Sequence, residues 1–246
     1  MSLTLQFHPD WPYQQGLVID AMVRDGRYRS QFETGTSNGG LTAKPGGDRW
    51  RWESRLFEGR YDDQEASARP VYGAWNRRTD PYGGSPRFGS AHFRMRPHVL
   101  ERTTFCFPDS VFEPAAVGGP EALPQLQRLA DEAGHDYLDD YVEAHVHGGV
   151  RFAEDVEALV LDPCHRGGPV AEAAAQLGCP IEFHPGFRAE TAQLEESYRG
   201  PRPVQLARAL GPVLTPETVA AAAAEGVHDP QTLKRVWHLL ARYGRQ

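Results

Sequence analysis

Candidate β-strands in this 246-residue chain cluster together instead of alternating with helices. Runs of β-prone residues bounded by turn-forming residues predict strands at 3–7, 50–52, 70–75, 87–95, 102–107, 141–146, 156–161 and 180–184. Helical spacing of apolar residues predicts helices at 16–24, 120–134 and 168–177, and only helices from residue 190 onward. Clustered strands followed by a helical tail favour an α+β fold over a doubly wound sheet.

The length suits one large domain, or one domain with an appended helical unit. We expect a core domain over residues 1–188 and a helical extension over residues 189–246 that packs on it. Neither a G-x-G-x-x-G run nor a P-loop is present in the sequence. The ordinary dinucleotide and nucleoside triphosphate fingerprints are therefore excluded.

Composition predicts a cytoplasmic protein. No window holds the roughly 18 apolar residues of a membrane span, and the N-terminus lacks a signal-peptide pattern. The three cysteines are far apart and odd in number, which indicates reduced thiols in place of disulfides. A net charge of −7 gives no global attraction to nucleic acid, so binding to nucleic acid would need local basic clusters.

One predicted strand carries a row of groups suited to catalysis. Side-chain alternation along this strand places Tyr141, Glu143, His145 and His147 on one face, with valine and alanine on the other. A carboxylate then lies beside two imidazoles, and the two glycines that follow open space next to them. A solvent-facing sheet edge explains the same pattern, so the row has two interpretations.

The first forty residues suggest a cradle for a small ligand. An apolar strand runs into His8, a helix-like stretch follows, and residues 31–40 form a polar, glycine-rich loop. Glycine lets a ligand approach the backbone closely. Taken alone, His8 is better explained as a structural histidine. Gly73 and Gly89 lie in predicted strands, where glycine marks either a close-lying ligand or a bulge.

Imidazole and thiol groups raise the alternative of a metal site. His145 and His147 are two residues apart, and Cys164, His165 and His184 lie downstream. They offer the nitrogen and sulfur ligands that zinc and related metals prefer. No H-E-x-x-H, His-x-x-x-His or paired-cysteine spacing supports the site. A metal-dependent hydrolase using His145, His147 and His184 is therefore the second hypothesis.

Several short sequence segments, taken together, resemble those of a known family. They are Phe7-His8-Pro9-Asp10, residues 28–40, 69–74, 86–90, 102–105 and 141–148. Through them, nearly the whole chain resembles an uncharacterised bacterial family of unknown function, and its element order resembles the ADP-ribosyltransferase fold. The resemblance implies a split mixed or antiparallel sheet with flanking helices. It also implies NAD as co-substrate and transfer of ADP-ribose to an acceptor.

The resemblance assigns roles to residues. His8 looks like the first-strand residue that binds a ribose hydroxyl, Tyr72 or Ser90 like the middle motif beside nicotinamide, and Glu143 like the catalytic glutamate. Tyr141 stands where a glutamate or glutamine is usual, so a shift of two residues would put His145 at the catalytic position. We expect catalytic roles for Glu143, His145 and Tyr72. The expected NAD-binding residues are His8, Gln31, Phe32, Thr34, Gly35, Ser37, Asn38, Gly39, Tyr72, Gly73 and Ser90.

The chemistry of the implied reaction accounts for these residue types. Breaking the nicotinamide–ribose bond develops positive charge on the ribose, which a carboxylate stabilises. His145 could take a proton from the acceptor, and no metal is required. The first hypothesis is thus an ADP-ribosyltransferase acting on a protein, nucleic acid or small molecule, with NAD hydrolysis as a side reaction. A non-catalytic nucleotide-binding module is the third.

Overall fold

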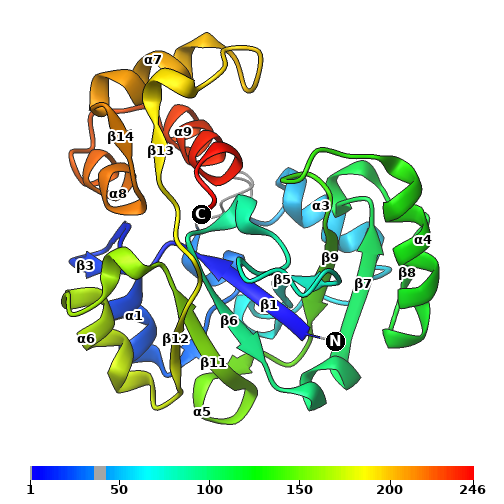
Figure 1. Cartoon of the computed structure of the whole chain (residues 1–246). Helices are drawn as coiled ribbons and strands as arrows, with labels where there is room; N and C mark the ends of the chain where they lie inside the picture. The colour runs from blue at the N-terminus through cyan, green and yellow to red at the C-terminus, as the bar shows by residue number, and fades with distance from the viewer. Residues whose placement is uncertain (1, 36–42) are drawn as a thin grey trace.

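The computed structural model describes residues 2–35 and 43–246, and its main feature is a mixed sheet of eight strands. The strand order is β12-β11-β6-β1-β5-β9-β7-β8 (Figure 1). β11 and β12 run parallel, whereas the other neighbours are antiparallel. The bounds are β1 Ser2–Phe7, β5 Val71–Asn76, β6 Ala91–Met95, β7 Thr103–Phe107, β8 Ala116–Gly118, β9 Val142–Val146, β11 Val156–Leu161 and β12 Ile181–Phe183.

Helices and three short ladders surround this sheet. The ladders pair β2 (Pro12–Tyr13) with β3 (Gly16–Leu17), β4 (Arg27–Tyr28) with β10 (Val150–Arg151), and β13 (Ala189–Glu190) with β14 (Val213–Leu214). The helices are α1 Val18–Asp25, α2 Gln31–Thr34, α3 Asp48–Leu56, α4 Leu123–Ala133, α5 Phe152–Asp155, α6 Pro169–Ala174, α7 Pro201–Leu210, α8 Pro216–Ala224 and α9 Pro230–Tyr243.

One face of the sheet is apolar and holds the main core. Leu3, Leu5 and Phe7 of β1 are buried there together with apolar side chains of the neighbouring strands. Helices α1, α4 and α6 supply the other half of this cluster, since their buried residues belong to it. Burial of this apolar surface is the main favourable contribution to folding.

The opposite face of the sheet is polar, and it is buried as well. Thr4 and Gln6 of β1 point to it, and both are buried. Residues paired across neighbouring strands share a face. The register therefore carries the polar face from β1 to β5, where Thr4 pairs with Ala74, and on to β9, where Tyr72 pairs with His145.

The C-terminal helices pack around a second apolar cluster, which includes Trp237 of α9, Val204 of α7 and Val219 of α8. The indole Nε1 of Trp237 donates to the carbonyl of Pro86 at 3.0 Å and holds α9 against the turn that precedes β6. In Figure 1, α7, α8 and α9 stand together at one end of the sheet, joined to β12 through the extended segment that contains β13. The expected domain boundary after residue 188 stays a prediction.

The α+β class predicted from the clustered strands is confirmed, and three local predictions are wrong. The strand expected at 87–95 begins only at Ala91, because Pro86–Phe88 form a 3-10 turn. Trp50–Trp52 was expected to be a strand but lies in α3, whose Arg49 and Glu53 are one turn apart and buried. Aromatic residues favour strands only weakly, and burial of a helix face outweighs that preference. The helix-only tail is interrupted by the ladder between β13 and β14.

No helix among residues 2–35 and 43–246 combines the length and apolar character needed to cross a bilayer.

Gly89 lies where β1 leaves no room for a side chain. A Cβ atom there would be 2.2 Å from the carbonyl carbon and oxygen of Phe7. Because these are backbone atoms, the strand itself would have to shift. We expect Gly89→Ala to lower the free energy of unfolding, measured by urea denaturation, by about 3 kcal/mol or more. Gly168→Ala is the control, since its Cβ would meet only the carbonyl oxygen of His165 at 3.6 Å. Equal stability of the two variants would contradict this explanation.

Candidate active site

Tyr72, His145 and Glu143 lie together in the middle of the polar face. β5 and β9 pair Tyr72 with His145, and the two rings meet edge to face with 5.0 Å between centroids. Glu143 accepts a hydrogen bond from Nε2 of His145 at 2.8 Å. The exposed fraction is 0% for His145 and 6% for Glu143. The structure brings these three expected residues together, and the interpretation of the row as a solvent-facing sheet edge is wrong.

A chain of hydrogen bonds continues from His145 along the polar face. Nδ1 of His145 lies 3.2 Å from the hydroxyl of Thr104, which lies 3.1 Å from Nε2 of His147. Nδ1 of His147 lies 2.6 Å from the hydroxyl of Tyr61. If His145 donates to Glu143, then Thr104 donates to His145, His147 to Thr104, and Tyr61 to His147. Every side chain in this series of hydrogen bonds has a partner, as buried polar groups require.

The surroundings of Glu143 favour its ionised form, the carboxylate. Burial by itself raises the pKa of Glu143, but the hydrogen bonds from His145 and Ser110 and the charge of Arg49 together outweigh it and lower the pKa on balance. The backbone N–H of Ser110 also donates to the carboxylate at 3.3 Å. Stabilisation of the charged form by hydrogen bonds and by a neighbouring cation is the usual cause of such a shift. The site therefore holds a negative charge at a fixed place.

Helix α3 lies over this group. Glu53 of α3 accepts hydrogen bonds from Arg69 at 2.5 Å and from the hydroxyl of Tyr72 at 3.0 Å. The side chains of Glu53 and Arg69 are 0% and 4% exposed. Just after α3, the ring of Phe57 meets the ring of His145 edge to face at 5.2 Å. The buried ion pair and the aromatic contact thus hold α3 over Tyr72 and His145.

Positive side chains gather beside the same group. The guanidinium of Arg49 lies over the ring of Tyr72, 4.9 Å from its centroid, as in a cation–π interaction. Lys234 of α9 lies near Arg49, within range of its charge. Burial, followed by the charges of Arg87, Arg49 and Arg199, lowers the pKa of Lys234 to about 8. Helix α9 therefore adds a cation to this side of the sheet.

A hollow of about 480 Å³ opens at the far end of the hydrogen-bond chain. Its lining includes Tyr61, the last member of the chain, together with Gly148 and Arg60. The volume falls within the range of ligand pockets, about 300–1,000 Å³. The hollow thus lies next to His147, while Glu143 lies at the other end of the chain.

His8 lies in different surroundings. Its ring stacks on Trp11 with 4.3 Å between centroids and meets Trp237 of α9 edge to face at 4.7 Å. Burial lowers the pKa of His8 to about 3, so the ring is neutral near pH 7. His8 follows β1, and β5 lies between β1 and the strand of Glu143. These contacts match the structural role that the sequence favoured for His8 when it was considered alone.

Gly73 and Ser90 also have structural explanations. A Cβ atom on Gly73 would lie 2.6 Å from the carbonyl oxygen of Thr4, so close packing of β5 on β1 accounts for this glycine. Ser90 precedes β6, and its carbonyl accepts a hydrogen bond from Nε2 of His184 at 2.8 Å. Two strands, β1 and β5, lie between β6 and β9. Ser90 is therefore not part of the group around Glu143.

The expected loop residues are divided between α2 and the undescribed segment. Gln31, Phe32 and Thr34 belong to α2, and Gly35 caps it in the left-handed conformation with φ of 62°. The guanidinium of Arg69 lies 4.2 Å from the ring centroid of Phe32, which links α2 to the ion pair under α3. The other three expected residues, Ser37, Asn38 and Gly39, lie outside the described residues.

The histidines of the hydrolase hypothesis do not come together. His145 and His147 share Thr104, but His184 follows β12 at the opposite edge of the sheet. Both of its ring nitrogens are engaged, Nε2 with Ser90 and Nδ1 with the N–H of Gly186. Cys106, Glu143 and His145 do place one ligand atom each within 4.8 Å of one another. Hydrogen bonds within that trio already explain its closeness.

Sequence reasoning missed the residues that cover and extend the group. Arg49 and Glu53 come from α3, of which residues 50–52 were predicted as a strand, so their i, i+4 spacing was not recognised. Thr104 lies in a correctly predicted strand, and its pairing with His145 depends on strand order. A helix assignment for residues 48–56 would have revealed the first two.

Comparison with known families decides the chain's membership. The profile of the family described as "Protein of unknown function (DUF3626)" matches residues 2–127 and 122–243. The chain belongs to this family. The expected link to a family of unknown function is thereby confirmed.

Comparisons with individual proteins add a structural similarity to the family match. No curated protein matches the sequence. Among solved structures, "Thermus sp. 2.9 DarT in complex with ADP-ribosylated ssDNA" is similar, with a TM-score of 0.47 and 11% identity. The match covers 74% of this chain and 93% of that chain.

Removal of Arg69 should destabilise the DUF3626 chain strongly. Arg69→Met leaves the carboxylate of Glu53 buried without its cation, which costs about 3–5 kcal/mol of unfolding free energy. Urea denaturation should show recovery of much of that loss in the double variant Glu53→Gln/Arg69→Met. Arg151→Met is the control, because its ion pair with Glu154 is 72% and 64% exposed and should contribute less than about 1 kcal/mol. A loss of similar size in both single variants would refute the buried-pair explanation.

Stability should fall on acidification because folding keeps His8 neutral. Its folded pKa of about 3 lies below the unfolded value of about 6.5, so the unfolded state binds the proton first. Stability from this group is present above pH 6.5 and is lost as pH falls towards 3, by up to about 1.4 kcal/mol per pH unit. His8→Phe retains a ring between Trp11 and Trp237. Urea denaturation at several pH values should give a shallower slope for this variant, and an unchanged slope would count against the prediction.

Proposed function

We propose that this protein is an NAD-dependent ADP-ribosyltransferase. The observation that carries the proposal is the buried group in which the Glu143 carboxylate, held by His145, lies beside the ring of Tyr72. Glu143 and Tyr72 are also the positions that resemble the catalytic glutamate and the nicotinamide-binding tyrosine of the ADP-ribosyltransferase fold. Sequence pattern and side-chain geometry therefore point to the same residues.

The proposed reaction uses Glu143 to stabilise charge. The bond between the nicotinamide nitrogen and ribose C1 breaks, and its electron pair leaves with neutral nicotinamide. The ribose then carries an oxocarbenium-like positive charge, which a fixed carboxylate in a buried site stabilises more strongly than water does. The acceptor forms a new bond to C1 and loses its proton, which completes the transfer of ADP-ribose.

His145 fits a positioning role for Glu143. Nε2 of its ring is bonded to Glu143, and Nδ1 is bonded to Thr104. Taking a proton from an acceptor would require one of these bonds to break. We therefore assign the charge-stabilising role to Glu143, with His145 holding the carboxylate in place. The proposal thus takes Glu143, and not His145, as the residue at the catalytic position.

The surroundings suit a dinucleotide. NAD carries a diphosphate, Arg49 supplies positive charge close to Glu143, and Lys234 lies near Arg49. Cations beside phosphates contribute charge-assisted hydrogen bonds. The hollow beside Tyr61 offers room for one end of the ligand at the far end of the same row of side chains. His8 would contribute by packing at the end of β1.

The proposal requires α3 to move. Glu143 and His145 are buried, and Glu53 and Phe57 lie over Tyr72 and His145. The nicotinamide ribose of NAD needs the space next to Tyr72 that α3 now covers. We therefore include an opening of α3 as the step that admits NAD. Such lid motions are common in enzymes that exclude water from a reactive intermediate.

The proposal predicts loss of NAD cleavage in Glu143→Gln. This variant keeps the shape of the side chain and removes its charge, so nicotinamide release from NAD should fall by about 100-fold or more. Glu157→Gln, on the exposed side of β11 where Glu157 pairs with Arg94, is the matched control and should release nicotinamide at the wild-type rate. Circular dichroism checks that both variants are folded.

Two other outcomes would change the assignment. Wild-type release by a folded Glu143→Gln variant would reject the role of Glu143. NAD binding without nicotinamide release, over long incubation with protein, single-stranded DNA and small-molecule acceptors, would favour the non-catalytic nucleotide-binding module.

A further inference from the structure

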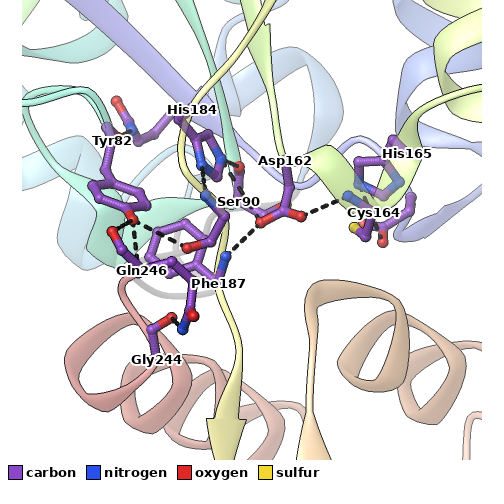
Figure 2. A network of polar contacts seen from close by, with 12 residues as sticks. Tyr82, Ser90, Asp162, Cys164, His165, His184, Phe187, Gly244 and Gln246 are labelled. Atoms are coloured by element: carbon purple, nitrogen blue, oxygen red, sulfur yellow. Dashed lines mark hydrogen bonds and ion pairs between the residues drawn. The ribbon is translucent and has the colours of Figure 1, made fainter.

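A second cluster of chemically active side chains lies away from Glu143. Cys164 and His165 belong to a short 3-10 turn, Pro163–His165, that follows β11, and Glu217 lies in the first turn of α8. The three residues each place one ligand atom within 4.8 Å of the others. Figure 2 shows Cys164 and His165 next to each other at one end of the polar network around Asp162.

Asp10 faces this cluster from the end of β1. Its Oδ2 lies 3.8 Å from Nε2 of His165, and the side chains are 9% and 3% exposed. Neither carboxylate oxygen of Asp10, nor Nε2 of His165, has a hydrogen-bond partner among the described residues, although these atoms are buried. A buried carboxylate without a partner is costly. Two unpartnered polar side chains that face each other therefore call for a ligand between them.

The turn that carries Cys164 and His165 is held rigidly. Asp162 accepts a hydrogen bond from the N–H of Cys164 at 2.9 Å and another from the N–H of Phe187 at 2.8 Å (Figure 2). Pro163 begins the turn and fixes its backbone. A preorganised turn lowers the entropic cost of binding an ion. The neighbouring hydrogen bonds thus support the ligand residues without occupying the unpartnered atoms.

We propose that Asp10, Cys164, His165 and Glu217 bind a zinc ion. A thiolate, an imidazole and carboxylates are the ligands that zinc takes in proteins. Two nitrogen or oxygen ligands about 2.0–2.2 Å from a tetrahedral zinc lie roughly 3.4 Å from each other, close to the separation of Asp10 and His165. On binding, the Cys164 thiol loses its proton to solvent and its sulfur forms the bond to zinc.

Four protein ligands make the site structural. They fill the tetrahedral shell and leave no position for a substrate. The ligands come from the end of β1, the turn after β11 and the C-terminal helix α8, so the ion would join three distant parts of the chain. β5 separates β1 from β9, the strand of Glu143, in the sheet order. The proposal is thus independent of the proposed transferase activity.

Elemental analysis of the full-length chain, purified without a metal-binding tag, tests the site. We expect about one zinc per chain in the wild type and below about 0.1 in Cys164→Ser, because a lost ligand weakens a structural site severely. Cys179→Ser is the matched control, since Cys179 is also a partly buried free cysteine and lies outside the cluster. It should retain the wild-type zinc content.

Cobalt gives a second measurement on the same proteins. Co²⁺ added to chelator-treated wild type should produce a thiolate-to-cobalt charge-transfer band, absent from Cys164→Ser and retained in Cys179→Ser. Asp10→Asn, which keeps the thiol, should weaken cobalt binding at least about tenfold. Wild type that is folded yet neither contains zinc nor gives the cobalt band would overturn the proposal. Equal metal content in Cys164→Ser and Cys179→Ser would overturn it as well.

Discussion

Polar side chains on a buried sheet face must each be satisfied by a partner, and this requirement organises the structure around Glu143. The loss of a hydrogen bond in such a place costs more than the bond itself contributes. The chain from Glu143 through His145 and Thr104 to His147 meets the requirement within the sheet. Glu53 meets it from above, for Arg69 and Tyr72. Side chains of α3 are therefore as necessary to the polar network on this face as those of the strands.

The two halves of the sheet differ in how their buried polar side chains meet this requirement. Around β5, β9 and β7, the hydrogen bonds form a continuous chain that ends at a hollow. Around β1 and β11, Asp10 and His165 face each other with unpartnered atoms. The first arrangement suits a carboxylate that stabilises positive charge during a reaction. The second suits a bound ion that supplies the missing partner of Asp10 and His165. The two functions proposed here thus rest on opposite responses to one physical constraint.

Much of the fold could be predicted from the sequence, since strand alternation and helical spacing are local signals. The row at Glu143 and His145 was recognised in this way, and its burial was not, because a polar face looks the same whether water or α3 covers it. The pairing of His145 with both Tyr72 and Thr104 depends on the order β5-β9-β7, which no local pattern contains. The surroundings of His8 could not be predicted for the same reason: its neighbour Trp237 is far away in sequence.

The closed position of α3 has an energetic consequence for any ligand of the site. If the open form holds about 1% of the molecules, the apparent dissociation constant rises about 100-fold over that of the open form. Such a protein is latent: it is inactive by default and is activated by whatever favours opening. A macromolecule that contacts the outer surface of α3 or the loop containing Phe57 would then control catalysis without touching Glu143. Latency would also protect the cell's dinucleotide pool between encounters.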